Sequence, residues 1–233
     1  MTTVTSQAER SLRSVRTELL TAAVGLLDDL GPDALQTRKI AAAAGTSTMA
    51  VYTHFGGMPT LIAEVADEGF RQFDAATAVP QTSDPVADLF AGGIAYRRFA
   101  IERPHLYRLM FGSTSAHGIN APAHNMLTLS LAEIGEHHPS FAHVVRAVHR
   151  SVLAGRIAVE SAGSDVSDAA VVAIAAQIWS AIHGFVMLEL AGFFGDDATA
   201  VGPVLGAMTT RLLIALGDSP ERVEQSLLAA RGR

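Results

Sequence analysis

Apolar side chains recur at every third or fourth position along most of this chain, which is the spacing of one face of an α-helix. The clearest case is residues 15–30, whose apolar stripe consists of Leu19, Leu20, Ala23, Leu26, Leu27 and Leu30. No run of residues alternates between apolar and polar side chains for long enough to predict a β-strand. The pattern therefore predicts an all-α fold.

Glycine and proline residues divide this pattern into separate helices, because glycine often ends a helix and proline fits its first turn. Gly31-Pro32, for example, ends the first helix. The second helix is expected to begin at Asp33 or Ala34, and the third is expected to follow a cap at Thr46 or Ser47. Later helices are predicted over residues 59–78, 85–101, 104–110, 123–137, 141–161, 167–191, 199–217 and 220–230. The first nine residues and the last few are expected to be disordered.

Residues 35–55 carry the most specific local signal in the chain. Their pattern predicts a helix, a turn at Gly45 and a short second helix. A small residue at Ala41 lets the two helices approach closely, and Gly45 can adopt the positive φ angle of a tight turn. Val51 returns to the core, so the polar side chains of the second helix face outward. This is the pattern of a helix-turn-helix whose second helix enters the major groove of DNA.

The same region resembles a known family. Within residues 15–66 the chain contains, in order, Leu27-x-x-x-Gly31-Pro32, Thr37-Arg38-x-Ile40-Ala41, Ala44-Gly45-x-Ser47 and Val51-Tyr52-x-His54-Phe55. With these motifs, about a quarter of the chain resembles the DNA-binding domain of TetR/AcrR-type transcriptional repressors. Further on, Trp179-x-x-x-His183-Gly184 resembles the Trp-His-Gly signature of one type of C-terminal domain in that family.

The resemblance implies two helical domains. Residues 10–58 would form a three-helix DNA-binding domain with the helix-turn-helix, and residues 59–78 would form a connecting helix. Residues 84–217 would form a larger domain for ligand binding and dimerisation. The hydrophobic fraction of 49% is sufficient for a substantial core in that larger domain.

The resemblance also indicates which side chains meet DNA. Thr37 and Arg38 lie at the start of a helix, where backbone N–H groups and positive charge can hold a phosphate. The next helix begins with side chains in reach of base edges, and Met49 suits a thymine methyl group. The residues expected to contact DNA are Thr37, Arg38, Ser47, Thr48, Met49, Tyr52 and His54.

One position departs from the family pattern. Relatives usually have a lysine at the start of the fourth helix, where this chain has Met58. A phosphate contact is then missing, or it passes to the Gly57 amide or to Thr60. We expect Arg10, Arg13 and Arg16 to compensate as a flexible arm on the phosphates or in the minor groove.

A regulator of this type needs a pocket for a small effector. Trp179 and His183 are four residues apart, so an indole N–H and an imidazole share one helix face. Such groups can orient a mostly apolar ligand, although aromatic and methionine side chains at helical spacing are also typical of a core. The candidate ligand-binding residues are Tyr96, Phe99, Met110, Phe111, Met126, His149, Trp179, His183 and Met187.

Neither a metal nor a cofactor is expected. The chain has no cysteine, and it has neither a glycine-rich phosphate loop nor a zinc-binding motif. His137 and His138 are adjacent and cannot share a helix face, while His117 and His124 lie in or near an expected loop.

The two long apolar helices at 167–191 and 199–217 are the best candidates for a homodimer interface. A dimer would place two recognition helices about one turn of DNA apart, so that they read a pseudo-palindrome. The net charge is −6, but residues 1–60 contain five basic and five acidic side chains. The acidic excess therefore lies outside the proposed DNA-binding face.

One segment imitates a membrane span. Residues 169–188 contain no formal charge over a length that could cross a bilayer. Polar side chains at Gln177, Ser180 and His183, and the lack of basic flanking residues, favour a core helix and no membrane association.

These observations together predict a cytoplasmic, dimeric, ligand-responsive repressor that binds double-stranded DNA and is not an enzyme. In the mechanism that the resemblance implies, a small effector shifts the protein away from its DNA-binding conformation, with helix 59–78 as the lever. Two alternatives remain open: an all-α hydrolase that uses a histidine with a carboxylate, and a membrane-associated adaptor. The sequence has no nucleophile elbow to support the hydrolase.

Overall fold

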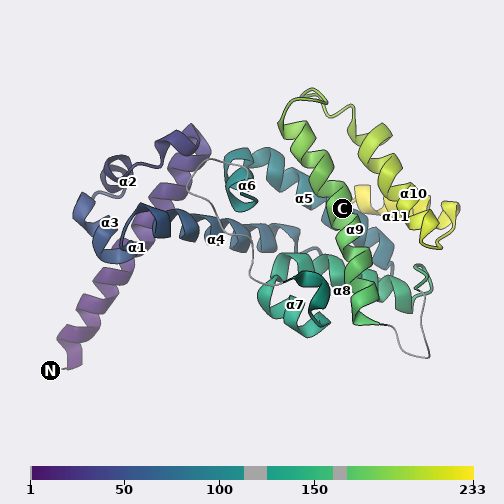
Figure 1. Cartoon of the computed structure of the whole chain (residues 1–233), viewed down its shortest axis with the longest axis horizontal. Coiled ribbons are helices and arrows are strands. Elements are labelled where there is room, and N and C mark those ends of the chain that lie inside the picture. The colour runs from purple at the N-terminus through teal and green to yellow at the C-terminus, as the bar shows by residue number, and fades with distance from the viewer. Residues whose placement is uncertain (1, 113–124, 160–166) are drawn as a thin grey trace. The chain divides into compact units, whose positions relative to one another are not determined.

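A computed structural model of the chain describes residues 2–112, 125–159 and 167–233, with side chains from Ser14 onward. These residues form helices and no strand, so the predicted all-α fold is confirmed (Figure 1). They divide into two compact units. The first contains the residues up to Gln72 and those from Arg103 to Gly112. The second contains Phe73–Glu102 and the described residues from Asn125 onward.

The first unit is built from five helices and one short turn. Its elements are α1 (Thr2–Leu30), a 3-10 turn (Pro32–Ala34), α2 (Thr37–Ala43), α3 (Thr48–Phe55), the part of α4 (Met58–Thr77) up to Gln72, and α6 (Pro104–Met110). Leu19, Ala23 and Leu27 of α1 are fully buried, at the four-residue spacing of a single helix face. The apolar stripe predicted for this helix is therefore its core face.

Helix α6 is held against the rest of the first unit by close packing and by an ion pair. An added Cβ at Gly69 of α4 would lie 2.7 Å from Met110 Cγ, so only glycine permits this approach. At the start of α6, Arg103 forms an ion pair with Asp28 near the end of α1. The sequence pattern gave no sign that α6 would pack with the first unit.

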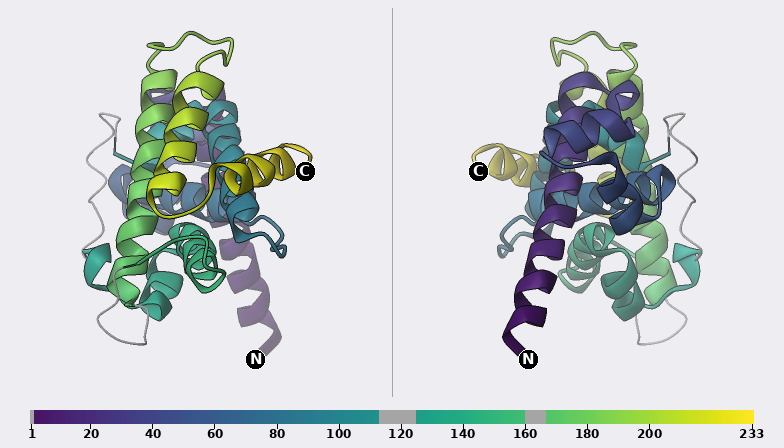
Figure 2. Two further views of the ribbon diagram at one scale, coloured as in Figure 1. Left: turned by 90° about the vertical axis from the view of Figure 1, so that its right-hand side faces the viewer. Right: turned by 90° about the vertical axis from the view of Figure 1, so that its left-hand side faces the viewer.

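The second unit consists mainly of long helices. Its elements are the last turn of α4, α5 (Pro85–Glu102), a 3-10 turn (Met126–Thr128), α7 (Leu131–His137), α8 (Pro139–Leu153), α9 (Asp168–Leu190), a π-helical turn (Val201–Gly206), α10 (Ala207–Ala215) and α11 (Pro220–Arg231). Helix α5 contacts α8, α9 and α11, and α9 runs beside α10 (Figure 2). The apolar core lies between these helices and includes Val86, Val148, Val172 and Val223.

A buried ionic network closes one end of this unit. Arg156, after α8, donates from Nε to both carboxylate oxygens of Asp218, which is fully buried. It also contacts Asp84 at 3.0 Å and Ser226 at 3.0 Å. Three segments that are far apart in the sequence, namely the start of α5, the end of α8 and the α10–α11 region, are thereby joined.

Several predicted helix boundaries were wrong, each for a local reason. The second helix begins at Thr37, because Pro32–Ala34 forms a separate 3-10 turn and Leu35 leaves helical geometry with ψ of 71°. The helix predicted to reach residue 161 ends at Leu153, because Gly155 adopts a left-handed φ of 62°. The first nine residues, expected to be disordered, are part of α1 from Thr2 onward.

Two other predicted helices are divided. The region 199–217 begins as a π-helical turn that contains Pro203, whose missing N–H interrupts the α-helical ladder. The described part of 123–137 contains a 3-10 turn and then α7, which starts at a reciprocal cap between Ser130 and Glu133. The uncharged segment 169–188 lies within α9, whose length and apolarity would suffice to cross a membrane. Its buried residues instead belong to the core of the second unit.

Candidate functional site

The turn between α2 and α3 has a well-defined hydrogen-bonding pattern. Gly45 has a φ of 63°, and its N–H donates to the carbonyl of Ala42 at 3.1 Å. The Thr46 N–H reaches back to the carbonyl of Ala41 at 2.9 Å. These two bonds form a Schellman motif, which ends α2 and redirects the chain into α3. The left-handed turn predicted at Gly45 is confirmed.

Small and apolar residues fix the crossing of the two helices. Ala41 is 2% exposed and Val51 is 0% exposed, so both face the core as the motif predicted. Phe55, at the end of α3, is also buried, and the guanidinium of Arg16 lies 5.0 Å from the centre of its ring. Val51 in the middle of α3 and Phe55 at its C-terminal end thus anchor this helix in the core of the first unit.

The outward face of α3 carries the predicted base-reading side chains. Ser47 is the exposed N-cap residue, although its hydroxyl makes no capping bond. Thr48 is exposed, and Met49 and Tyr52 are 68% and 55% exposed. His54 is half-buried in the last turn. A solvent-facing row of a hydroxyl, a thioether and a phenol on one short helix has no role in packing this unit.

The start of α2 provides the expected positive charge. Thr37 is its first residue and is half-buried, while Arg38 and Lys39 are exposed. Neither Arg38 nor Lys39 forms an ion pair in the part of the chain that the structure describes. Their charges are therefore available to a polyanion.

Arg16 does not behave as the flexible arm that we expected. It forms an ion pair with Glu64 of α4 and covers the ring of Phe55. Its partners belong to the first unit, so it stabilises the fold there. Arg10 and Arg13 lie in the helical part of α1, and their side chains are outside the described residues.

In the second unit, three of the predicted ligand-binding residues meet. The indole N–H of Trp179 donates to the hydroxyl oxygen of Tyr96 at 3.3 Å, and that hydroxyl lies 3.1 Å from Nδ1 of His183. Tyr96 comes from α5, and the other two come from α9. We call Tyr96, Trp179 and His183 the polar trio. Burial lowers the pKa of His183 below its ordinary value, so its imidazole is neutral near pH 7.

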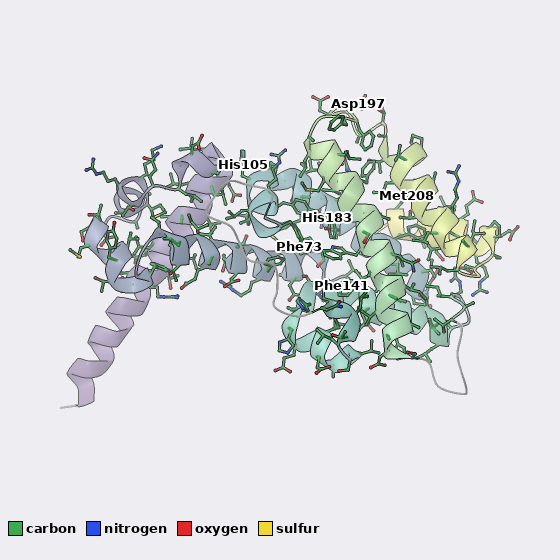
Figure 3. All side chains as sticks on the ribbon, in the orientation of Figure 1. Phe73, His105, Phe141, His183, Asp197 and Met208 are labelled. Carbon is green, nitrogen blue, oxygen red and sulfur yellow. The ribbon has the colours of Figure 1, made fainter. Side chains whose placement is uncertain are left out.

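Aromatic rings surround the polar trio. Phe73 packs edge-on against Tyr96, with ring centres 4.9 Å apart, and also against Phe99, with centres 5.2 Å apart. The ring centres of Phe141 and Trp179 are 5.6 Å apart. Phe73, Phe141 and His183 are labelled in Figure 3. Phe99 was among the predicted residues, whereas Phe73 and Phe141 were missed. Phe73 and Phe141 lie on the apolar faces of amphipathic helices, so the sequence does not distinguish them from ordinary core residues.

The other predicted ligand-binding residues come from both units. Met126 packs at the edge of the second unit's core, and His149 and Met187 are half-buried. Met110 and Phe111 belong to the first unit, where Met110 packs on Gly69. Phe111 there contacts the rings of Phe70 and Tyr107. The geometry of the second unit therefore does not include Met110 and Phe111.

A groove of about 640 Å³ is found in the first unit, between α1 and the end of α2. It is lined by Ser14, Thr17, Glu18, Thr21, Ala22, Ala43 and Ala44, none of which was a predicted ligand residue. Among the described residues, no three histidine or acidic side chains are grouped as metal ligands. His117 and His124 lie outside the described residues.

Both units match known protein families. Residues 19–65 match the family described as bacterial regulatory proteins, tetR family, and residues 89–212 match a family described as the Tetracyclin repressor-like C-terminal domain. The second match covers more than half of the chain. Neither description names the Trp-His-Gly type of C-terminal domain. No curated protein matches the sequence.

Three solved structures illustrate the likeness. A protein of unknown function from Rhodococcus sp. RHA1 is 27% identical, with a TM-score of 0.65, and the match covers 88% of this chain and 96% of that one. RolR in complex with resorcinol is 15% identical, with a TM-score of 0.61 and coverage of 94% and 95%. A gamma-butyrolactone receptor described as ArpA-like is 16% identical, with a TM-score of 0.54 and coverage of 95% and 97%. The last two likenesses concern the fold alone.

Proposed function

The chain belongs to the TetR family of bacterial regulatory proteins, and from this premise we propose that it is a homodimeric, cytoplasmic repressor released from its operator by a small apolar effector. It is a ligand-responsive transcription regulator, not an enzyme. The hydrolase and the membrane adaptor are not favoured, because regulator families match both units of the chain.

The observation that carries the DNA-binding part of the proposal is the exposed face of α3. Thr48, Met49 and Tyr52 project from a helix that the Gly45 turn holds at a fixed angle. Side chains at the start of a recognition helix reach base edges, and those on its flanks reach phosphates. In this proposal Thr37 and Arg38 bind the DNA backbone, and Ser47 and His54 complete the contact surface.

Helices α9 and α10 would form the dimer interface. Leu188 and Val204 are 46% and 38% exposed, and Phe193 in the intervening connection is 75% exposed. Large apolar side chains exposed near one another are typical of surfaces that are covered in an assembly. A two-fold axis there would present two copies of α3 to a pseudo-palindromic site.

The polar trio is the proposed effector site. RolR has been solved with resorcinol, and another relative of similar fold is a gamma-butyrolactone receptor. Both names concern small molecules of low charge, and the aromatic surroundings of Tyr96 and Trp179 suit a ligand of that kind. On the basis of Trp179, His183 and Gly184, the proposal also assigns the second unit to the Trp-His-Gly type of C-terminal domain.

The decisive experiment selects genomic DNA fragments with the purified full-length protein and then measures binding to the enriched sequence. A pseudo-palindrome bound by two chains is expected. Thr48→Ala should weaken binding by at least about fivefold, since a lost phosphate or base contact costs about 1–3 kcal/mol. Thr53→Ala is the matched control, because the Thr53 hydroxyl already donates to the Met49 carbonyl at 3.0 Å. Equal losses in both variants would contradict the proposed contact surface.

A further inference from the structure

Arg16 of α1 connects the end of α3 to α4 within the first unit. Its guanidinium lies 5.0 Å from the centre of the ring of Phe55, the last residue of α3. The same guanidinium donates from Nη2 to Oε2 of Glu64, which belongs to α4. A cation over an aromatic face and an ion pair are both attractive, so one side chain joins three helices.

The backbone between α3 and α4 restrains their angle only weakly. It consists of Gly56 and Gly57, whose φ angles are 70° and 152°. Glycine has the widest conformational freedom of any residue, so side-chain contacts must hold the two helices at a fixed angle. Val51 anchors the middle of α3, and the contacts of Phe55 then decide how the helix is tilted about that point.

A tilt at one end of α3 also moves its other end. Thr48 and Phe55 are the first and last residues of this helix, with roughly 10 Å of helix between them. Contacts with base edges depend on close hydrogen-bond geometry, whereas the electrostatic attraction of phosphates does not. A displaced Phe55 would therefore harm the recognition of sequence more than the general affinity for DNA.

We propose that Arg16 is a positioning residue for the recognition helix: held by Glu64, it fixes Phe55 and thereby sets the orientation in which α3 distinguishes its operator from other DNA. The inference rests on the proposed function, in which α3 reads base edges. It adds a residue that determines specificity without touching DNA. The charge of Arg16 is matched by Glu64, so its contribution to the attraction of phosphates is small.

The test measures a discrimination ratio with the full-length protein. This ratio is the affinity for the selected operator divided by the affinity for a scrambled duplex of the same length at the same salt concentration. Arg16→Gln should lower the ratio at least about fivefold, because a tilted helix loses a base contact in each half-site. Affinity for the scrambled duplex should stay within about twofold. Arg16→Lys should restore most of the ratio, since an ammonium can make both contacts.

The contrasting variant is Arg38→Gln, because Arg38 is an exposed, proposed phosphate contact on α2. It should weaken binding to both duplexes alike. It should also reduce the slope of log affinity against log salt by about one for each bound chain. If Arg16→Gln follows this pattern instead, Arg16 touches a phosphate directly and the proposal is overturned.

The link through α4 is tested with Glu64→Gln, which keeps the size of the side chain and removes its charge. This variant should lower the discrimination ratio as Arg16→Gln does, and the double variant should be no worse than either single one. Additive losses would show that the two residues act separately, which would contradict the proposal.

A matched control separates positioning from stability. Asp28→Asn breaks a different ion pair of α1, that with Arg103, and should leave the discrimination ratio unchanged. All binding is measured at a temperature where circular dichroism shows each variant to be folded. An equal loss of discrimination in Asp28→Asn and Arg16→Gln would overturn the assignment of Arg16. Failure of the unaltered protein to select any operator would count against the proposed function instead.

Discussion

At the scale of single residues, Met49 is the clearest specificity candidate on α3. A methionine that is 68% exposed does not stabilise the fold by burial, but it can pack on a thymine methyl group in the major groove. Met49→Ala is expected to weaken binding to a thymine-containing half-site by about 1 kcal/mol, the value of a lost apolar contact of this size. Binding titrations with the selected operator provide the measurement.

The control for Met49 is chemical as well as mutational. Replacing the contacted thymine by uracil should weaken operator binding by the unaltered protein to the same extent. The same replacement should leave operator binding by Met49→Ala unchanged. Leu153→Ala, at an equally exposed position of α8, should have no effect on either duplex. If the uracil substitution affects both proteins alike, Met49 does not read the methyl group.

At the scale of helices, the arginine network that closes the second unit offers a prediction about stability. Arg156 is almost buried and faces fully buried Asp218, whereas Arg222 lies 3.5 Å from the same carboxylate with its side chain 48% exposed. Arg156→Met strands a buried carboxylate and should lower the free energy of unfolding by about 3–5 kcal/mol. Arg222→Met should lower the free energy of unfolding by less than about 1 kcal/mol. Urea denaturation followed by circular dichroism compares them, and similar losses would refute the network's importance.

Helix α4 supplies a prediction about coupling. Phe73 lies near the end of this helix and contacts Tyr96 of the polar trio, so a change at the trio reaches α4 directly. Phe73→Leu should keep effector affinity within about threefold but reduce the effector's influence on operator affinity at least about tenfold. Calorimetric titration of effector, with and without operator, measures this coupling.

The control for Phe73 is Phe141→Leu, because Phe141 contacts Trp179 of the same trio from α8. That variant is expected to lose effector affinity while keeping the coupling. Since coupling between two ligands is reciprocal, the factor by which operator weakens effector binding must fall equally in Phe73→Leu. If both leucine variants retain full coupling, the contact between Phe73 and Tyr96 does not transmit the signal.

The helix boundaries that the sequence predicted well are those marked by a nearby proline or glycine. Pro104 at the start of α6 and Gly45 after α2 act within a few residues, so their effects can be read from the chain. The early end of α8 was not predicted, because a glycine in the sequence does not by itself show that it adopts the left-handed φ that Gly155 has. The interruption before α10 was missed because Pro203 was read as part of a continuous helix.

At the scale of the whole molecule, the two proposed sites differ in how far the sequence predicts them. The proposed DNA-binding surface lies within one continuous segment, and its exposed residues follow from helical spacing. The polar trio joins Tyr96 to residues more than eighty positions later, so no local pattern indicates the pairing. The Arg156–Asp218 pair is also remote, with its members 62 positions apart, and nothing near either residue in the sequence distinguishes it from a surface charge.

The acid stability of the molecule follows from three groups in the second unit. Burial alone would raise the pKa of Asp84, but the Ser226 hydrogen bond, the Val86 and Ala87 amides and the nearby Arg156 charge lower it overall. For Asp88, burial is likewise outweighed by hydrogen bonds from Arg233, Thr82 and Arg150. The stabilisation that comes from a depressed carboxyl pKa is fully present above the ordinary pKa of 3.8. It is lost as the pH falls from 3.8 through the lower pKa of the folded state.

His183 acts in a higher pH range. Its pKa is lowered from 6.5 by burial, so between its folded pKa and 6.5 the unfolded chain binds more protons than the folded one. Stability must therefore fall as the pH decreases through this range, well before the carboxyls contribute. The urea midpoint, measured from pH 8 to pH 3, should decline in two stages. His183→Gln should flatten the upper stage only, and Asp88→Asn, although less stable throughout, should flatten the lower stage only. A single transition that neither variant alters would mean that these buried groups do not control the acid response.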